Sequence, residues 1–326
     1  MSTDKINIAE LKKPIVSIGM PIFNDVKYLS KALDDLLGQS FRDYELIISD
    51  NASTDGSGEI CQRYAAMDKR IQYIRQPINI GPIANFALVL DRAVGEFFLW
   101  AASDDRWHRD FISTLLACLI NNNDCIVAFC PFIYIDEHEH QTGVIKHFDF
   151  SGSTQLERTI KFILNRDLGR DSFVYGLYRT NCLRDIRYPV WWWINKTVPI
   201  NTAHPICLFI LARGGYAMSD QAIPLWQKRL CLEINTRHHV FSHDNPIITR
   251  MAFVLRRINL YYEFIISVYR GSRSLSLTLV LIPFISIITA YECLKYVLRF
   301  LWAIFKYFIL RQSALYECSE LSRPKR

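Results

Sequence analysis

The sequence lacks the glycine-rich motifs by which nucleotide-binding proteins are most readily recognised. Neither GxxxxGK[ST] nor GxGxxG occurs in its 326 residues, so neither a P-loop nor a dinucleotide fingerprint is present. The nine cysteines are odd in number, show no CxxC spacing and lie mostly in apolar runs, which is typical of reduced core residues in a cytosolic protein. Residues 1–13 carry five charged side chains and no apolar run, so no cleaved secretory signal is expected there.

The composition favours a folded protein with anionic partners. Half of the residues are hydrophobic, enough for one large domain with an appendage. The formal net charge is +6, and the Lys and Arg residues are scattered except near the C-terminus. This mild excess suits anionic substrates or lipid headgroups, and we expect no nucleic-acid partner.

Short apolar runs alternate with segments of helical period in the first 135 residues, which predicts a mostly parallel sheet with helices on both faces. The predicted strands are residues 15–20, 44–49, 71–75, 97–101 and 126–133. The first helix is expected to begin after Asn24 or Asp25, either of which can cap it. Its expected buried face holds four leucines at helical spacing: Leu29, Leu33, Leu36 and Leu37.

The rest of the chain divides into a second part of the domain and a helical tail. We expect an N-terminal extension at 1–13, one half of an α/β domain at 14–135, its other half at 136–250 and a membrane-associated segment at 251–326. Residues 173–179 are expected to form a strand in which Gly176 permits a close backbone approach. Residues 274–291 carry no charge, about the minimum length for a membrane span, although a buried helical hairpin is the alternative. Residues 292–311 have charges on one face and are typical of a helix in the membrane interface.

Acidic and polar residues follow three of the predicted strands. The first strand leads into Asn24, the second into Asp50 and Asn51, and the fourth into Asp104 and Asp105. Ligands of open α/β sheets bind outside the carboxyl ends of the strands, so these side chains are expected to converge. Carboxylates there can hold a base or ribose and one hard divalent cation, which neutralises a diphosphate. The alternatives are ordinary turn residues and acids that complement a helix dipole.

Four segments in order, PIVSIGMPIFN (14–24), DNASTDGS (50–57), NIGPIANF (79–86) and SDD (103–105), resemble family 2 glycosyltransferases with the GT-A fold. The resemblance covers roughly residues 14–240, and it implies that 14–135 is the nucleotide-sugar-binding half and 136–250 the acceptor-binding half of the domain. It implies a Rossmann-like, mostly parallel sheet and an inverting transferase that uses a nucleotide-diphosphate sugar. It also implies a divalent cation, Mn²⁺ or Mg²⁺, as cofactor.

The resemblance assigns roles to individual positions. Asp50 would contact the nucleobase, Asp104 would face the ribose or sugar, and Asp105 would bind the metal. The other donor-site candidates are Pro21, Phe23, Asn24, Asn51, Asn79, Gly81 and Asn85. Ser103 occupies a position where similar proteins often have an acid, so fewer protein oxygens are expected around the metal. His239, in a segment rich in Arg and His, is a second candidate metal ligand because imidazole suits Mn²⁺.

The catalytic base is assigned by the same resemblance. Similar enzymes open an acceptor-side helix with an Asp base, and His204 falls at that position. Imidazole titrates near neutral pH and can accept the proton of an acceptor hydroxyl. The alternative is that His204 is a helix-start or core residue of an enzyme whose base is lost or lies elsewhere.

These observations predict a glycosyltransferase at the cytoplasmic face of the plasma membrane that acts on a glycan or lipid-linked acceptor. The basic residues that flank the uncharged run favour this side of the membrane. A second hypothesis is a nucleotide-sugar-binding protein of the same fold with impaired catalysis. A nucleotidyltransferase is a third, but no basic, glycine-rich phosphate loop supports it.

Overall fold

The computed structural model describes residues 13–165, 169–186, 190–193, 196–199, 203–221, 224–229, 261, 263–291, 293–295, 297–298 and 302. The first half contains β1 (Val16–Ile22), α1 (Leu29–Leu37), β2 (Tyr44–Asp50), α2 (Ser57–Met67), β3 (Ile71–Arg75), α3 (Pro82–Arg92), β4 (Phe97–Trp100), β5 (Arg106–Trp107) and α4 (Phe111–Asn121). The second contains β6 (Cys125–Phe129), β7 (Phe132–Ile135), β8 (Gln141–Lys146), α5 (Gln155–Leu164), η2 (Arg170–Tyr175), β9 (Leu177–Arg179), η3 (Thr180–Leu183), β10 (Val190–Trp193), β11 (Lys196–Pro199), α6 (Ala203–Arg213), β12 (Gly215–Met218) and β13 (Trp226–Arg229).

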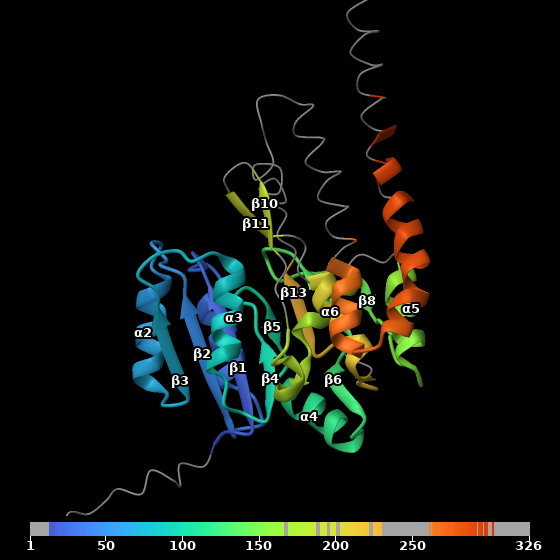
Figure 1. Cartoon of the computed structure of the whole chain (residues 1–326). Coiled ribbons are helices and arrows are strands. Elements are labelled where there is room, and N and C mark those ends of the chain that lie inside the picture. Colours follow the sequence, from blue (N-terminus) through green and yellow to red (C-terminus); the bar gives the residue numbers. More distant parts are fainter. Residues whose placement is uncertain are drawn as a thin grey trace, which may run out of the picture.

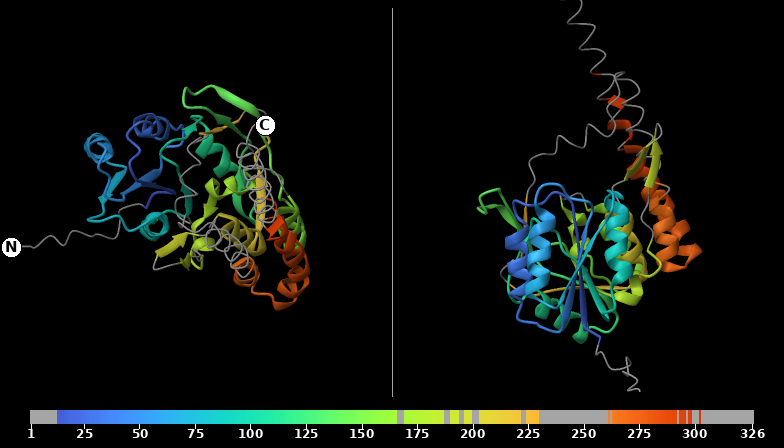
Figure 2. Two further views of the ribbon diagram at one scale, coloured as in Figure 1. Left: turned by 90° about the horizontal axis from the view of Figure 1, so that it is seen from above. Right: turned by 90° about the vertical axis from the view of Figure 1, so that its left-hand side faces the viewer.

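The central sheet has seven strands in the order β12-β6-β9-β4-β1-β2-β3. The short β9 is antiparallel to both of its neighbours, while the other strand pairs are parallel. Helices α1 and α2 cover one face of its N-terminal part, and α3 covers the other (Figures 1 and 2). The prediction of a mostly parallel sheet with helices on both faces is therefore confirmed.

The N-terminal strands fold as their sequences predict, because β1, β2 and β4 are almost continuously buried. Apolar residues without alternation are typical of parallel strands covered on both faces. Leu29, Leu33 and Leu36 of α1 are fully buried in the same core, whereas Leu37 is only partly buried.

The start of α1 differs from the prediction. The helix begins at Leu29, its cap position is Tyr28, and no side chain caps it. Asn24 and Asp25 were expected to cap this helix, but the Asp25 carboxylate instead accepts hydrogen bonds from Phe23 N and Ser103 Oγ. The residue is used to join two loops, which a helix-start pattern does not reveal.

The apolar run at 126–133, predicted as one strand, is two strands in different sheets. β6 belongs to the central sheet, and β7 belongs to a second sheet of order β5-β13-β7-β8. Cys130 and Pro131 separate them, and proline has no N–H to continue a ladder. The second sheet packs beside the first, with β13 pairing both β5 and β7.

The segment 173–179, predicted as one strand, is divided: its first three residues end the 3₁₀-helix η2, and its last three form the strand β9. The expected close approach at Gly176 is confirmed. A Cβ on Gly176 would lie 2.7 Å from the carbonyl oxygen of Ala128. A larger residue here would push β9 away from β6.

The described C-terminal residues pack against the domain through one face. Val268, Leu281 and Ile285 are buried in the common core. The helix Leu275–Lys295 is the one described helix long and apolar enough to cross a membrane. Large apolar side chains are exposed along its outer side and just beyond its end: Leu275, Leu279, Val280, Phe284, Ile287, Tyr291, Leu294, Val297, Leu298 and Trp302. The helix is seen in orange and red in Figure 1.

Candidate active site

The loops that follow β1, β2 and β4 are bonded to one another at the carboxyl end of the central sheet. Asn24 N donates to Ser53 Oγ at 3.0 Å, and Thr54 N donates to Asn24 Oδ1 at 2.9 Å. Ser103 Oγ donates to Asp25 Oδ2 at 2.6 Å. The three acidic and polar segments noted in the sequence therefore form one surface, as their positions at strand ends predict.

Asp50 lies at the end of β2 and is completely buried. Its Oδ1 accepts from Ser53 N, and its Oδ2 accepts from both Tyr73 Oη and Arg75 Nη1, each at 2.8 Å. Arg75 also donates to Ser53 O. The carboxylate thus holds the loop after β2 in shape and orients the half-exposed Arg75 side chain. Burial raises the pKa of Tyr73 to about 12, so its hydroxyl remains a donor at neutral pH.

Three asparagines join the loop before α3 to the ends of β1 and β2. Asn51 Nδ2 donates to Asn79 Oδ1, and Asn51 Oδ1 accepts from Ile80 N. Asn85, 2% exposed, donates to the carbonyl oxygens of Ser49 and Ile22. Buried amides placed in this way hold backbone that would otherwise be unpaired.

Gly81, between Asn79 and the start of α3, has a φ of 85° and open space where a Cβ would stand. Its N–H donates to Asn79 Oδ1. Only glycine adopts this backbone conformation without strain, and Pro82 follows at the start of α3.

The loop after β1 presents an exposed apolar side chain beside these polar groups. Pro21 is half-buried in β1, opposite Ser49 of β2. Phe23 is 44% exposed. Asn24 adopts a left-handed backbone with a φ of 56°. An exposed phenyl ring beside hydrogen-bonding groups suits contact with a planar base.

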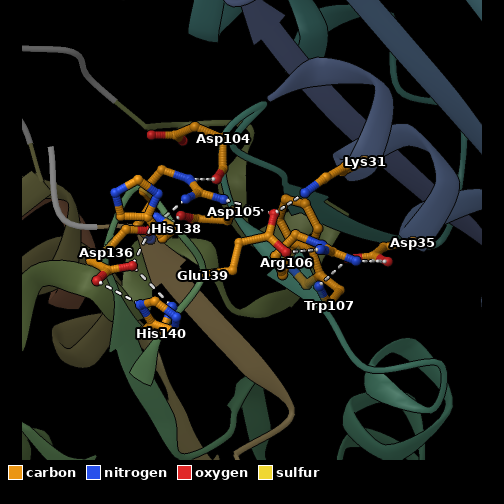
Figure 3. Close-up of polar contacts among 11 residues, drawn as sticks. Lys31, Asp35, Asp104, Asp105, Arg106, Trp107, Asp136, His138, Glu139 and His140 are labelled. Carbon is orange, nitrogen blue, oxygen red and sulfur yellow. Dashed lines mark hydrogen bonds and ion pairs between the residues drawn. The ribbon is translucent and has the colours of Figure 1, made fainter. Parts of the chain in front are cut away.

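Asp104 and Asp105 have different environments (Figure 3). Asp104 is partly exposed, whereas Asp105 is 2% exposed and both of its oxygens are bound by β13. Trp226 Nε1 donates to Oδ2 at 2.9 Å, and Arg229 N donates to Oδ1 at 2.7 Å. Burial raises the pKa of Asp105 to about 7; the positive charge of Lys228 opposes the rise and the negative charge of Asp104 adds to it.

Asp25 is a site residue that the sequence interpretation missed. Burial raises the pKa of its carboxyl, the hydrogen bond from Ser103 opposes the rise, and the nearby negative charges of Asp104 and Asp55 add to it. Negative charges that lie close together disfavour one another, so a positive charge brought by a ligand would be favourable here. The sequence indicates Asp25 only as a helix cap, because this residue lies far from residues 103–105 along the chain.

The described residues include the oxygen ligands that a divalent cation prefers, but they do not form a complete coordination site. Carboxylate oxygens are the donors that Mg²⁺ and Mn²⁺ prefer. Within the described part of the chain, no three His, Cys, Asp or Glu side chains form a group able to hold a metal by themselves. Phosphate oxygens of a ligand would have to complete the coordination. His239 lies outside the described residues.

His204 lies in the first turn of α6 and is partly buried. Its ring packs edge-on against Phe162 of α5 at 5.8 Å and against Phe264 at 6.3 Å between centroids. Only Gly214 separates α6 from β12, which runs parallel to β6. A helix that directly precedes a strand of a parallel sheet runs antiparallel to that strand. The first turn of α6 therefore lies toward the carboxyl end of the sheet.

Comparison with known proteins agrees with this geometry. The profile of "Glycosyl transferase family 2" matches residues 17–187. An uncharacterised glycosyltransferase of Haemophilus influenzae is 34% identical over 194 residues, 55% of this chain and 76% of that protein. The GalNAc(5)-diNAcBac-PP-undecaprenol beta-1,3-glucosyltransferase of Campylobacter jejuni is 36% identical over 104 residues, 32% of this chain and 34% of the other.

Among solved structures, S. aureus TarS 1–349 in complex with UDP-GlcNAc superposes with a TM-score of 0.56 at 18% identity. The superposition covers 78% of this chain and 71% of that one, which shows a shared fold. This chain spans 14% of Streptococcus pneumoniae GlyA and 47% of Bacillus subtilis TuaG. The profile match over more than half of the sequence and the GT-A architecture together establish that the chain belongs to glycosyl transferase family 2.

Proposed function

We propose that this protein transfers a sugar from a nucleotide-diphosphate donor to an acceptor hydroxyl, with inversion at the anomeric carbon, in the assembly of a surface polysaccharide or glycolipid. The observation that carries the proposal is the single surface formed by the loops after β1, β2 and β4. It brings Asp25, Asp50 and the Asp104–Asp105 pair to one end of the sheet. The UDP-GlcNAc complex of TarS, a protein of the same fold, supports the donor class.

The nucleoside is proposed to lie over the loops after β1 and β2. Pro21, Phe23 and Asn24 would contact the base or ribose directly, with the exposed Phe23 ring against the base. Asp50, whose oxygens are occupied, would act through the loop and Arg75 that it holds.

The remaining donor-site candidates are proposed to shape the pocket wall. Asn51 and Asn79 hold the loop that contains Gly81, and Asn85 fixes the strand ends below it. The bare backbone at Gly81 would allow close approach of the donor.

One divalent cation is proposed to bind at the acidic pair. Since β13 already binds both oxygens of Asp105, we assign the direct contact mainly to the partly exposed Asp104, with Asp105 holding the loop and contributing a remaining lone pair. His239 is a proposed additional ligand. A bound cation would supply positive charge to the departing diphosphate.

His204 is the proposed base. It would take the proton of the acceptor hydroxyl as that oxygen bonds to the anomeric carbon. The bond from the anomeric carbon to the phosphate oxygen breaks in the same step, and the nucleoside diphosphate leaves with the bonding electrons. The position of His204 in the first turn of α6 supports this role.

The acceptor is proposed to be a glycan or a lipid-linked glycan at the cytoplasmic face of the plasma membrane. The exposed apolar side of the helix Leu275–Lys295 supports contact with lipid, and so does the undecaprenol-linked substrate in the name of the Campylobacter relative. Because Leu281 and Ile285 are buried against the domain, the first half of this helix cannot be surrounded by lipid. A helix lying along the membrane surface is therefore favoured.

The test is transfer by the purified 326-residue chain with a panel of nucleotide-sugar donors and Mn²⁺ or Mg²⁺. We expect nucleoside diphosphate as product, and we expect Asp104→Ala or EDTA to abolish its release. Binding of a donor without turnover would support the alternative, a catalytically impaired nucleotide-sugar-binding protein. Release of pyrophosphate from a nucleoside triphosphate would contradict both.

A further inference from the structure

The last residue of β13, Arg229, is a buried arginine that joins three separate segments of the chain. Its side chain is 2% exposed. A buried guanidinium requires partners for its donors, because an unpaired buried charge is strongly destabilising. Two of the groups that Arg229 holds belong to the acidic pair of the proposed metal site.

The first contacts of Arg229 are with the acidic pair. Its Nε donates to the carbonyl oxygen of Asp104 at 2.8 Å, and its own backbone N–H donates to Asp105 Oδ1 at 2.7 Å. The Asp104 carbonyl belongs to the planar peptide group that joins the two aspartates. Holding that oxygen sets the orientation of the plane, and with it the directions in which both side chains leave the backbone.

The second contacts anchor the guanidinium on the far side. Nη1 donates to Asp136 O at 2.6 Å, and Nη2 lies 3.5 Å from Glu139 Oε1. The guanidinium carbon also lies 3.9 Å from the centroid of the Tyr28 ring. All three nitrogen atoms and one face of the group are therefore engaged.

Glu139 connects Arg229 to the first helix of the fold. It forms ion pairs with Lys31 at 2.7 Å and Arg106 at 2.8 Å, and Arg106 in turn binds Asp35 of α1 (Figure 3). The acidic loop is therefore supported from β13 and from α1 at once. Lysine cannot replace this arrangement, because an ammonium is a point charge that lacks the planar fork of arginine.

We infer that Arg229 is a positioning residue for the metal and diphosphate: it fixes the Asp104–Asp105 peptide so that the Asp104 carboxylate faces the cation. The inference rests on the proposed function for its ligand. Without the guanidinium, the Asp104 carbonyl oxygen loses its donor and the peptide can rotate, while Asp105 keeps both of its hydrogen bonds from β13. Binding of the cation then weakens before the chemistry is affected.

The experiment compares Arg229→Lys with a matched control, Arg158→Lys, in the 326-residue chain. Arg158 is also buried, at 6% exposed, and also donates to two backbone carbonyls, Leu211 O and Gly152 O, but it lies in α5. Binding of Mn²⁺ is measured by paramagnetic resonance with and without UDP. Donor KM and kcat are measured at saturating Mn²⁺, and thermal unfolding monitors the fold.

Arg229→Lys is expected to weaken Mn²⁺ binding and raise donor KM about tenfold, the effect of losing hydrogen bonds to a charged group, with kcat little changed. Arg158→Lys is expected to lower thermal stability similarly and leave Mn²⁺ binding as in the parent. Equal Mn²⁺ binding by the parent and Arg229→Lys overturns the inference, and so does an equal loss in both variants. Sugar transfer that needs no metal also overturns the inference, but it leaves the proposed transfer function standing. If Mn²⁺–UDP binding depends on Arg229 but the chain transfers no sugar, the inference stands and the proposed function is contradicted.

Discussion

Replacing Asp105 with asparagine removes a buried ionisable carboxyl group, and the structure predicts how the effect of this change on stability varies with pH. Burial raises the pKa of Asp105 from 3.8 to about 7. Between these values the native protein holds a proton that the unfolded chain has lost. The native state therefore loses stability as the pH rises through that interval, and the loss is complete above about pH 7.

The size of this loss of stability follows from the width of the pH interval between the two pKa values. From about pH 5 to about pH 7 the parent loses about 1.4 kcal/mol per pH unit at this residue, or about 3 kcal/mol in all. The variant does not undergo this loss. It has a constant penalty instead, because an amide has one acceptor oxygen for the two donors Trp226 Nε1 and Arg229 N. An unmet buried donor costs about 1–3 kcal/mol at every pH.

The assay is urea unfolding of both proteins with EDTA present, at several values from about pH 5 to about pH 8. The free energy of unfolding of Asp105→Asn should rise by about 3 kcal/mol relative to the parent across this range. Asp185→Asn is the control, because ion pairs with Arg213 and Arg273 lower the pKa of that carboxyl and place its effect below the range. Parallel curves for Asp105→Asn and the parent would refute the reasoning, since they would show that the two donors and Lys228 keep Asp105 ionised throughout.

Three further predictions address the base, the sheet and the membrane. His204→Ala should lower kcat by about 10²–10⁴-fold with donor KM unchanged. An unaltered kcat would show that another group is the base. Gly176→Ala should lower the free energy of unfolding in urea by about 1–3 kcal/mol, because the new methyl group meets the Ala128 carbonyl; an unchanged midpoint would show that β9 can shift. The double variant Ile287→Glu, Leu294→Glu should no longer sediment with anionic phospholipid vesicles, whereas Met67→Glu, which changes an exposed apolar residue on α2, should still do so. Retained sedimentation of the double variant would place the lipid contact elsewhere.

The amino-acid sequence by itself determined the alternation of strands and helices up to β6, the positions of Asp50, Asn51 and Asp104 at strand ends, and the family. These features are local. A buried parallel strand, an amphipathic helix and an Asp-Asn turn each have a signature within a few residues, and the carboxyl ends of parallel strands meet wherever the sheet forms.

Only the tertiary structure decided how the site is held. Asp105 receives both of its hydrogen bonds from β13, more than a hundred residues later in the chain, and Asp25 is bound by Ser103 instead of capping α1. The apolar run at 126–133 divides between two sheets at Pro131. Such contacts have no local signature, because the partner of a buried polar group is set by which segments pack together, and packing depends on the whole chain.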